Sequence, residues 1–261
     1  MTIADINRRK LDLGRVFGDT FGVIRRQAVP LLGVTFVLGY LPGLASSYLG
    51  RLVTGGAPPS PTAPFAALSN PLYLVLALIS LFLTGYLMAC QLQIAIGDLE
   101  GQRLTLPEVL RRAVGKVLPI FGAMLLLGVG VMLGTLLLLV PGVILGIMWA
   151  VALPATVADT SNPIRALGRS RALTRGNRWR IFGLAIIAWV VLVVIELIIF
   201  GAIGGVTGLT RVGGASFLTV ALLSLASVLT YIVGTAGSAA LYTQLRELKG
   251  EGGETVAQVF A

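Results

Sequence analysis

The chain has 261 residues, of which 56% are hydrophobic and 12% charged, and its formal net charge is +9. About a quarter of the residues of a soluble domain are charged, so this composition excludes an ordinary soluble fold and indicates a polytopic membrane protein. The sequence contains no histidine and a single cysteine, Cys90, which excludes histidine-based catalysis and an intrachain disulfide.

Apolar runs long enough to cross a membrane recur along the chain. A helix needs about 20 apolar residues to cross a hydrocarbon core of about 30 Å. We expect helices rather than a β-barrel, because these runs are continuously apolar and do not alternate with polar residues. The sequence predicts six spans, near residues 28–49, 70–96, 117–140, 142–158, 179–203 and 215–242.

The third and fourth spans are expected to form a tight hairpin. Residues 117–158 are too long for one crossing, and Pro141 and Gly142 predict the turn, because proline lacks a backbone donor and glycine permits a sharp bend. Two GxxxG patterns flank this turn and favour close helix packing: Gly130 with Gly134, and Gly142 with Gly146.

A short amphipathic helix is expected before each odd-numbered span. The first carries apolar residues at helical spacing: Leu13, Phe17, Phe21 and Ile24. The second begins with a capping-box pattern, Thr105 and Glu108, and the third with Asn162 as the cap before Pro163. Such helices lie in the headgroup plane with the apolar face toward the membrane.

These elements repeat. The junctions AVPLLG, VLPIFG and RWRIFG join each amphipathic helix to its span, which predicts three copies of one unit over about 12–97, 104–159 and 162–245. The predicted fold class is therefore all-α: a polytopic membrane helix bundle of six transmembrane helices, in three units of interfacial amphipathic helix plus helical hairpin. We expect a single membrane domain, 1–250, and a mobile cytoplasmic tail, 251–261.

The basic residues predict the orientation. Of the 20 lysines and arginines, all but Arg51 and Arg211 fall on one side of the predicted spans, and such an excess marks the cytoplasmic side. Together with an even number of spans, it places both termini in the cytoplasm. The net charge is then mainly a topology signal, and nucleic acid is not expected as a partner.

Basic residues and a tryptophan at the helix-to-span junctions form the first candidate site. Aromatic and basic residues anchor helices at the membrane interface, and a basic residue near an anionic surface contributes about 1 kcal/mol. Simple anchoring and a specific pocket for an anionic lipid headgroup are both open. The candidates are Arg25, Arg26, Lys116, Arg175, Arg178, Trp179 and Arg180.

Glu196 is the one acidic residue inside a predicted span. A charged side chain at that depth costs about 2.5–3.5 kcal/mol on insertion scales. Glu196 is therefore a candidate proton or cation site, and the alternative is a protonated side chain bonded to a neighbouring helix. Hydroxyl and small residues of the sixth span could line a transport path, but they are more typical of helix packing.

Polar residues also end the second and fourth spans. Gln91 and Gln93 are followed by Asp98 and Glu100. Paired carboxylates can bind a divalent cation or act in acid–base chemistry, but a solvated loop is the expected role here. Asp159 is expected to be a polar border or a cap. We expect no catalytic residue, no metal and no cofactor.

One region resembles a known family. The run LLLLVPGVILGIMWAVALPATVAD and the following ALGRSRALTRGNRWRIFG resemble the membrane domain fused ahead of some bacterial glycerophosphodiester phosphodiesterases, and its stand-alone relatives. The matching motifs, between about 138 and 183, are Pro141-Gly142, Trp149, Pro154, the RS-x-x-LT-x-G pattern from Arg169, and the Trp179 junction. The resemblance implies a multi-helix bundle of unknown biochemical role. The phosphodiesterase domain is absent, so neither catalytic residues nor diesterase activity is implied.

The sequence favours a non-enzymatic integral protein of the bacterial inner membrane. Its expected role is that of a lipid-associated scaffold or accessory protein, with membrane lipids, especially anionic headgroups, as partners. The alternative is a small-molecule or ion transporter or channel with Glu196 in the path. An intramembrane enzyme is disfavoured, because the chain has no histidine and no paired acids within a span.

Overall fold

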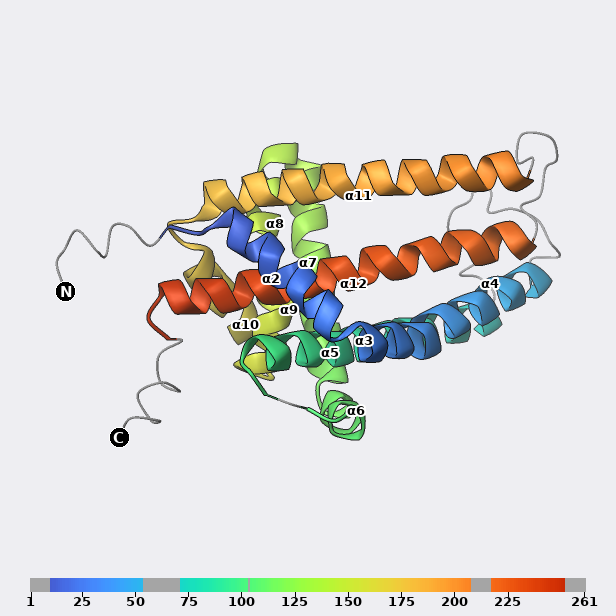
Figure 1. The fold of residues 1–261 in the computed structure, drawn as a ribbon, viewed down its shortest axis with the longest axis horizontal. Coiled ribbons are helices and arrows are strands. Elements are labelled where there is room, and N and C mark those ends of the chain that lie inside the picture. Colours follow the sequence, from blue (N-terminus) through green and yellow to red (C-terminus); the bar gives the residue numbers. More distant parts are fainter. Residues whose placement is uncertain (1–9, 54–70, 103, 208–216, 252–261) are drawn as a thin grey trace.

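The structure, a computed structural model, describes residues 10–53, 71–102, 104–207 and 217–251. Their regular secondary structure is entirely helical, which confirms the all-α prediction for this part of the chain. The predicted tail lies outside it except for Glu251. The elements (Figure 1) are α2 (Leu13–Arg26), α3 (Ala28–Thr35), the π-helix η1 (Phe36–Tyr40), α4 (Leu41–Val53), α5 (Pro71–Leu99), α6 (Leu106–Val114), α7 (Val117–Leu137), α8 (Leu139–Met148), α9 (Ala152–Ala158), α10 (Pro163–Thr174), α11 (Arg178–Thr207) and α12 (Phe217–Leu248).

Within the described residues, five helical segments are long and apolar enough to cross a membrane. They are Ala28–Ser46, Leu74–Leu99, Val117–Leu137, Leu139–Ala158 and Arg178–Ile199. They coincide with the first five predicted spans, and such a set is typical of a multi-pass membrane protein. The described part of the sixth predicted span, from Phe217 on, lies in α12, a continuous helix of 32 residues.

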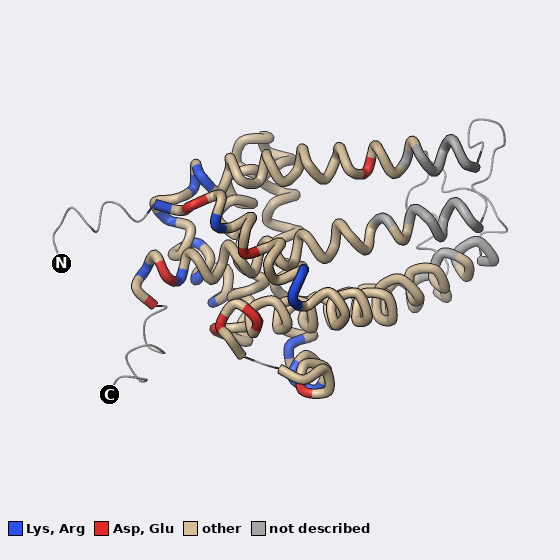
Figure 2. Tube along the Cα trace, in the orientation of Figure 1, with Lys and Arg blue, Asp and Glu red and all other residues tan. Residues whose placement is uncertain are grey.

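The long helices do not all run the same way. In Figure 1 the α3–η1–α4 segment, α5, α11 and α12 lie along one common axis, whereas α7 and α8 are steeply inclined to this axis. Charged residues gather at the end of the bundle where α2 begins and α12 ends (Figure 2), and α11 carries a single acidic residue, Glu196, farther along its length. One half of the bundle is therefore nearly free of charge in the described residues.

Local capping starts the short helices. The Glu108 carboxylate accepts hydrogen bonds from the backbone N–H and the hydroxyl of Thr105, both at 2.9 Å, which lowers its pKa. Asn162 accepts from the backbone N–H groups of Ile164 and Arg165. Both predicted caps are thus present, and each satisfies donors that a helix start leaves without a partner.

Helix α2 packs against α12 through a face that lies beside the predicted apolar stripe. Its buried residues are Val16, Thr20 and Val23, whereas Phe21 of the predicted stripe is 58% exposed. The other predicted positions, Leu13, Phe17 and Ile24, flank the buried face and are partly buried. Because Thr20 donates its hydroxyl to the backbone carbonyl of Val16, it can be buried without an unpaired donor.

The chain reverses between α7 and α8 at Leu138, whose backbone is extended, three residues before the predicted turn at Pro141 and Gly142. Pro141 lies in the first turn of α8, where its missing N–H costs no helical hydrogen bond. Gly142 faces α7 so closely that a Cβ there would overlap the Thr135 hydroxyl and lie 2.8 Å from the Thr135 backbone nitrogen. Its role is therefore close helix contact.

The core lies toward the charged end of the bundle. Fully buried side chains concentrate in α5 between Leu87 and Ile96 and in α12 between Ala236 and Leu245. Many large apolar side chains of α7, α8 and α11 are exposed, as expected for helices that face lipid. The charged end is consequently the best-packed part of the molecule, and it holds the polar groups described next.

Candidate functional site

An apolar groove of about 630 Å³ lies between α8 and the start of α11. Its walls are five aliphatic residues of α8 and three residues of α11: Leu139, Val140, Val143, Ile144, Ile147, Arg178, Trp179 and Phe182. Leu139 and Val140 are 69% and 65% exposed, so the groove is open along one side. Its volume and lining are those of a site for an extended apolar ligand.

Arg178 is the one charged residue of the groove. Its Nε atom is buried and has no hydrogen-bond partner among the described residues. Trp179 is 85% exposed and meets the Phe182 ring edge to face, at 6.1 Å between centroids. The structure therefore joins two predicted headgroup residues, Arg178 and Trp179, to an apolar surface that the sequence did not connect with them.

The other predicted interface residues lie elsewhere. Arg26 donates to Asp98 at 2.6 Å, which raises its pKa, and Arg180 donates to the backbone carbonyl of Leu11 at 2.6 Å. Lys116 donates to Ser161 at 3.0 Å. Arg25 and Arg175 are exposed, and the structure does not gather all seven candidates in one pocket.

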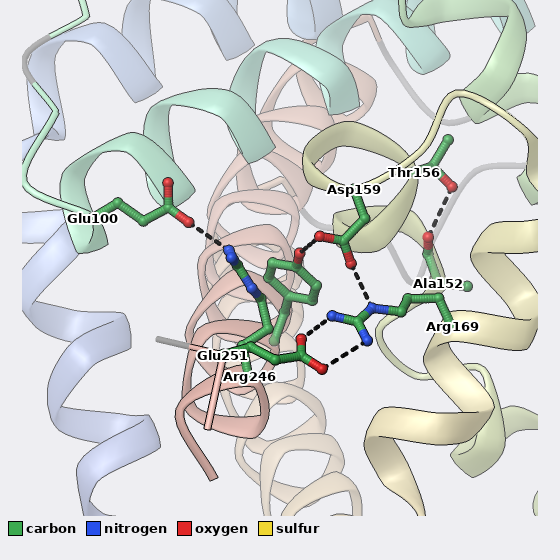
Figure 3. A network of polar contacts seen from close by, with 8 residues as sticks. Glu100, Ala152, Thr156, Asp159, Arg169, Arg246 and Glu251 are labelled. Atoms are coloured by element: carbon green, nitrogen blue, oxygen red, sulfur yellow. Dashed lines mark hydrogen bonds and ion pairs between the residues drawn. The ribbon is translucent and has the colours of Figure 1, made fainter. Parts of the chain in front are cut away.

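A network of polar contacts ties α10 to the ends of α9 and α12 (Figure 3). The Asp159 carboxylate accepts a hydrogen bond from the Tyr242 hydroxyl at 2.7 Å and one from Arg169 Nε at 2.8 Å. Arg169 also forms a two-pronged ion pair with Glu251. This arrangement joins residues up to 83 positions apart, so it fixes how the three helices meet.

The same network shifts two pKa values. The hydrogen bond to Glu251 raises the pKa of Arg169 above its usual value, with further help from Asp159 and against the effect of desolvation. The hydrogen bond from Arg169 lowers the pKa of Glu251. Both groups are therefore ionised at neutral pH, and the pair favours the charged form of each.

A polar cavity of about 510 Å³ adjoins the network. Residues of α5, α6, α9 and α12 line it together with the two connections next to α6: Gln93, Ile96, Gly97, Glu100, Gln102, Leu104, Arg112, Lys116, Val157, Ala158, Asp159 and Arg246. Arg246 donates to Glu100 at 2.8 Å across one end (Figure 3). Glu100 thus belongs to an ion pair, and Asp98, which binds Arg26, does too, although a solvated loop was expected here.

Glu196 is exposed, and its nearest described polar partner is Thr230, whose hydroxyl donates to it at 3.3 Å. It lines neither the groove nor the polar cavity. The bond confirms no transport role, but it does connect α11 to α12 within the predicted spans. Glu196 therefore forms a polar contact between α11 and α12.

A smaller cavity, of about 220 Å³, lies among η1, α5 and α12. Its polar lining includes Thr35, Thr84 and Ser227, and each of these hydroxyls donates to a backbone carbonyl of its own helix. Gln91 donates to Thr35 Oγ at 2.7 Å. Because π-helices often occur at functional sites, η1 marks this cavity as a second candidate.

Sequence reasoning did not pair the residues of the ion-pair network. Asp159 was expected to be a border residue, and no role was assigned to Tyr242 or Arg246. The pairing depends on contacts between helices far apart in the chain, which no local pattern reveals. The available signal was the position of each residue at the end of an apolar run.

The fold is helical, with five helices in the described residues long and apolar enough to cross a membrane, as in a multi-pass membrane protein, and with polar groups gathered at one end. Residues 109–245, more than half of the chain, match DUF7847, which is described as a domain of unknown function, and the chain belongs to this family. The match gives no link to the membrane domains of glycerophosphodiester phosphodiesterases, so only membership of a family of unknown function is shown. No curated protein and no solved structure matches the chain.

Proposed function

We propose that the protein is a non-enzymatic, lipid-associated scaffold or accessory protein of the bacterial inner membrane, which binds an anionic phospholipid in the α8–α11 groove. One observation carries the proposal: in the described part of the chain, the open apolar groove has a single arginine in its wall, and the Nε of this arginine is buried and has no hydrogen-bond partner there. An acyl chain fits the aliphatic wall, and a phosphate satisfies Arg178.

The headgroup, rather than the chain, supplies selectivity. A lipid chain that moves from the bilayer into an apolar groove exchanges one apolar environment for another, so it gains little transfer free energy. A charge-assisted hydrogen bond to a phosphate contributes roughly 1.5–3 kcal/mol. Arg178 is therefore the residue that distinguishes an anionic lipid from a zwitterionic one, while Trp179 holds the groove entrance at the interface.

We extend the proposal to the topology: six spans in three units, with both termini in the cytoplasm. The length of α12 supports a sixth span, since 32 residues extend about 48 Å as a helix. The gathering of charge at one end of the bundle (Figure 2) supports the cytoplasmic location of both termini. The hairpin of α7 and α8 is the part of this topology that most needs a test, because these two helices run steeply across the other long helices (Figure 1).

Native mass spectrometry of the purified protein tests the lipid site. Retained phosphatidylglycerol should fall severalfold in Arg178→Gln and stay at the wild-type level in Arg165→Gln. Arg165 is the matched control, because it is an exposed arginine of α10 outside the groove. Equal retention in the two variants would remove the basis of the proposal.

The second candidate function is transport, and the hydroxyl-lined cavity beside η1 favours it. The sequence-based alternative placed Glu196 in the path, but Glu196 is not among the residues that line this cavity. Flux of monovalent cations into proteoliposomes separates the possibilities. Flux that disappears in Glu196→Gln supports that path, whereas no flux with the wild type counts against transport.

A further inference from the structure

The polar cavity between α5, α6, α9 and α12 has an excess of unpaired positive charge. Its lining holds two carboxylates: Glu100 pairs with Arg246, and Asp159 shares Arg169 with Glu251. Among the described residues, neither Arg112 nor Lys116 forms an ion pair. The lining thus carries three cations, Arg112, Lys116 and Arg246, against two carboxylates, and this balance of charge favours an anion.

Lys116 and Arg112 are available for such an anion. The Lys116 ammonium donates only to neutral oxygens, the Ser161 hydroxyl at 3.0 Å and the Thr156 carbonyl at 3.4 Å. Arg112 is exposed, so an anion can reach the cavity from the aqueous side. An ammonium and a guanidinium on one cavity wall are the groups that bind phosphate in proteins.

Gln93 supplies the independent observation. Its side chain lies in the wall of the cavity and is 8% exposed, and neither its amide nitrogen nor its amide oxygen has a hydrogen-bond partner in the described part of the chain. An unpaired buried amide costs roughly the desolvation free energy of the group. A ligand with both acceptor and hydroxyl groups satisfies it.

We propose that this cavity binds a phosphate-bearing anion through Arg112 and Lys116, with Gln93 donating to it. At about 510 Å³ the cavity falls within the usual range for small-ligand sites and exceeds the size of inorganic phosphate. A phosphorylated small molecule and a lipid headgroup share this chemistry. The site is separate from the Arg178 groove, because the two have no lining residue in common.

Isothermal titration of the full-length protein in nanodiscs of zwitterionic lipid tests the site, with inorganic phosphate as the first probe. Arg112→Gln and Lys116→Gln should each weaken phosphate binding about tenfold, as expected for the loss of one charge-assisted contact. Arg111→Gln is the matched control, because Arg111 is an exposed neighbour on α6 that does not line the cavity. Gln93→Glu, which places a negative charge in the wall, should abolish binding.

A second titration, with dihexanoyl phosphatidic acid, distinguishes the two sources of phosphate. Binding of this lipid alone identifies a headgroup site. Binding of both the lipid and inorganic phosphate identifies a site open to soluble phosphates. Either result supports the proposal if Arg112→Gln weakens the binding. Arg178→Gln should leave the titration with inorganic phosphate unchanged, because Arg178 does not line this cavity. Binding of neither probe, or equal weakening by Arg111→Gln and Arg112→Gln, would overturn it.

Discussion

Replacement of Gly142 by alanine should force α7 and α8 apart. The added Cβ would overlap the Thr135 hydroxyl, which can rotate, but it would also lie 2.8 Å from the Thr135 nitrogen and 2.9 Å from its Cα, which cannot. Gly146 is the control on the same helix, since a Cβ there meets nothing within 4 Å. Overpacking costs roughly 1–3 kcal/mol, whereas alanine in place of glycine favours a helix by about 1 kcal/mol.

The two variants share the gain in helix propensity, so the difference between them isolates the clash. Gly142→Ala should therefore be less stable than Gly146→Ala by roughly 1–3 kcal/mol. Reversible unfolding in mixed detergent micelles measures this difference in free energy. Equal stability of the two variants would refute the close approach of α7 and α8 that shapes one wall of the groove.

Three further predictions concern the charged end and the topology. Asp159→Asn should lower the free energy of unfolding by roughly 1–3 kcal/mol, because it removes a half-buried ion pair. Asp19→Asn is the control: it removes an exposed ion pair with an N–O distance of 3.7 Å and should change the free energy of unfolding by less than about 0.5 kcal/mol. Equal effects of the two variants in thermal unfolding would contradict this prediction. Arg169 holds the pKa of Glu251 below its usual value, so the ion pair between them is present at neutral pH and is lost as the pH falls through that lowered pKa. Glu251→Gln at pH 7 should reproduce this loss, seen as faster hydrogen exchange of residues 245–250. Unchanged exchange would count against a role of the pair in holding the end of α12. In a Cys90→Ser background, Leu138→Cys should react with an impermeant maleimide from outside the cell and Ser161→Cys only after permeabilisation. The opposite pattern would rule out a cytoplasmic N-terminus.

The sequence predicted what depends on local patterns. Composition and apolar run length were enough for the helical class and for the first five spans, and the caps at Thr105 and Asn162 follow from a few neighbouring residues. The sequence identified the apolar stripe of α2, but a stripe shows which residues are apolar and not which partner covers each of them. Phe21 of the stripe is exposed, whereas Thr20 beside it is buried against the bundle.

The candidate site was predictable only in part. Arg178 and Trp179 were identified from their place before a span, but the α8 wall that makes a groove beside them depends on how the hairpin folds back. The bond between Asp159 and Tyr242 joins residues 83 positions apart. Helix-to-helix packing alone brings such residues together, and the sequence of one chain carries no periodic signal for it.

If an anionic phospholipid occupies the groove beside Trp179, its acyl chain lies within contact of the indole ring. The most direct measurement is Trp179 fluorescence in a Trp149→Phe, Trp189→Phe background, in bilayers that contain lipids brominated on the acyl chain. Brominated phosphatidylglycerol should quench Trp179 more strongly than brominated phosphatidylcholine at the same mole fraction, and Arg178→Gln should abolish the difference. Equal quenching by the two lipids in the protein that retains Arg178 would contradict the binding of an anionic phospholipid in this groove.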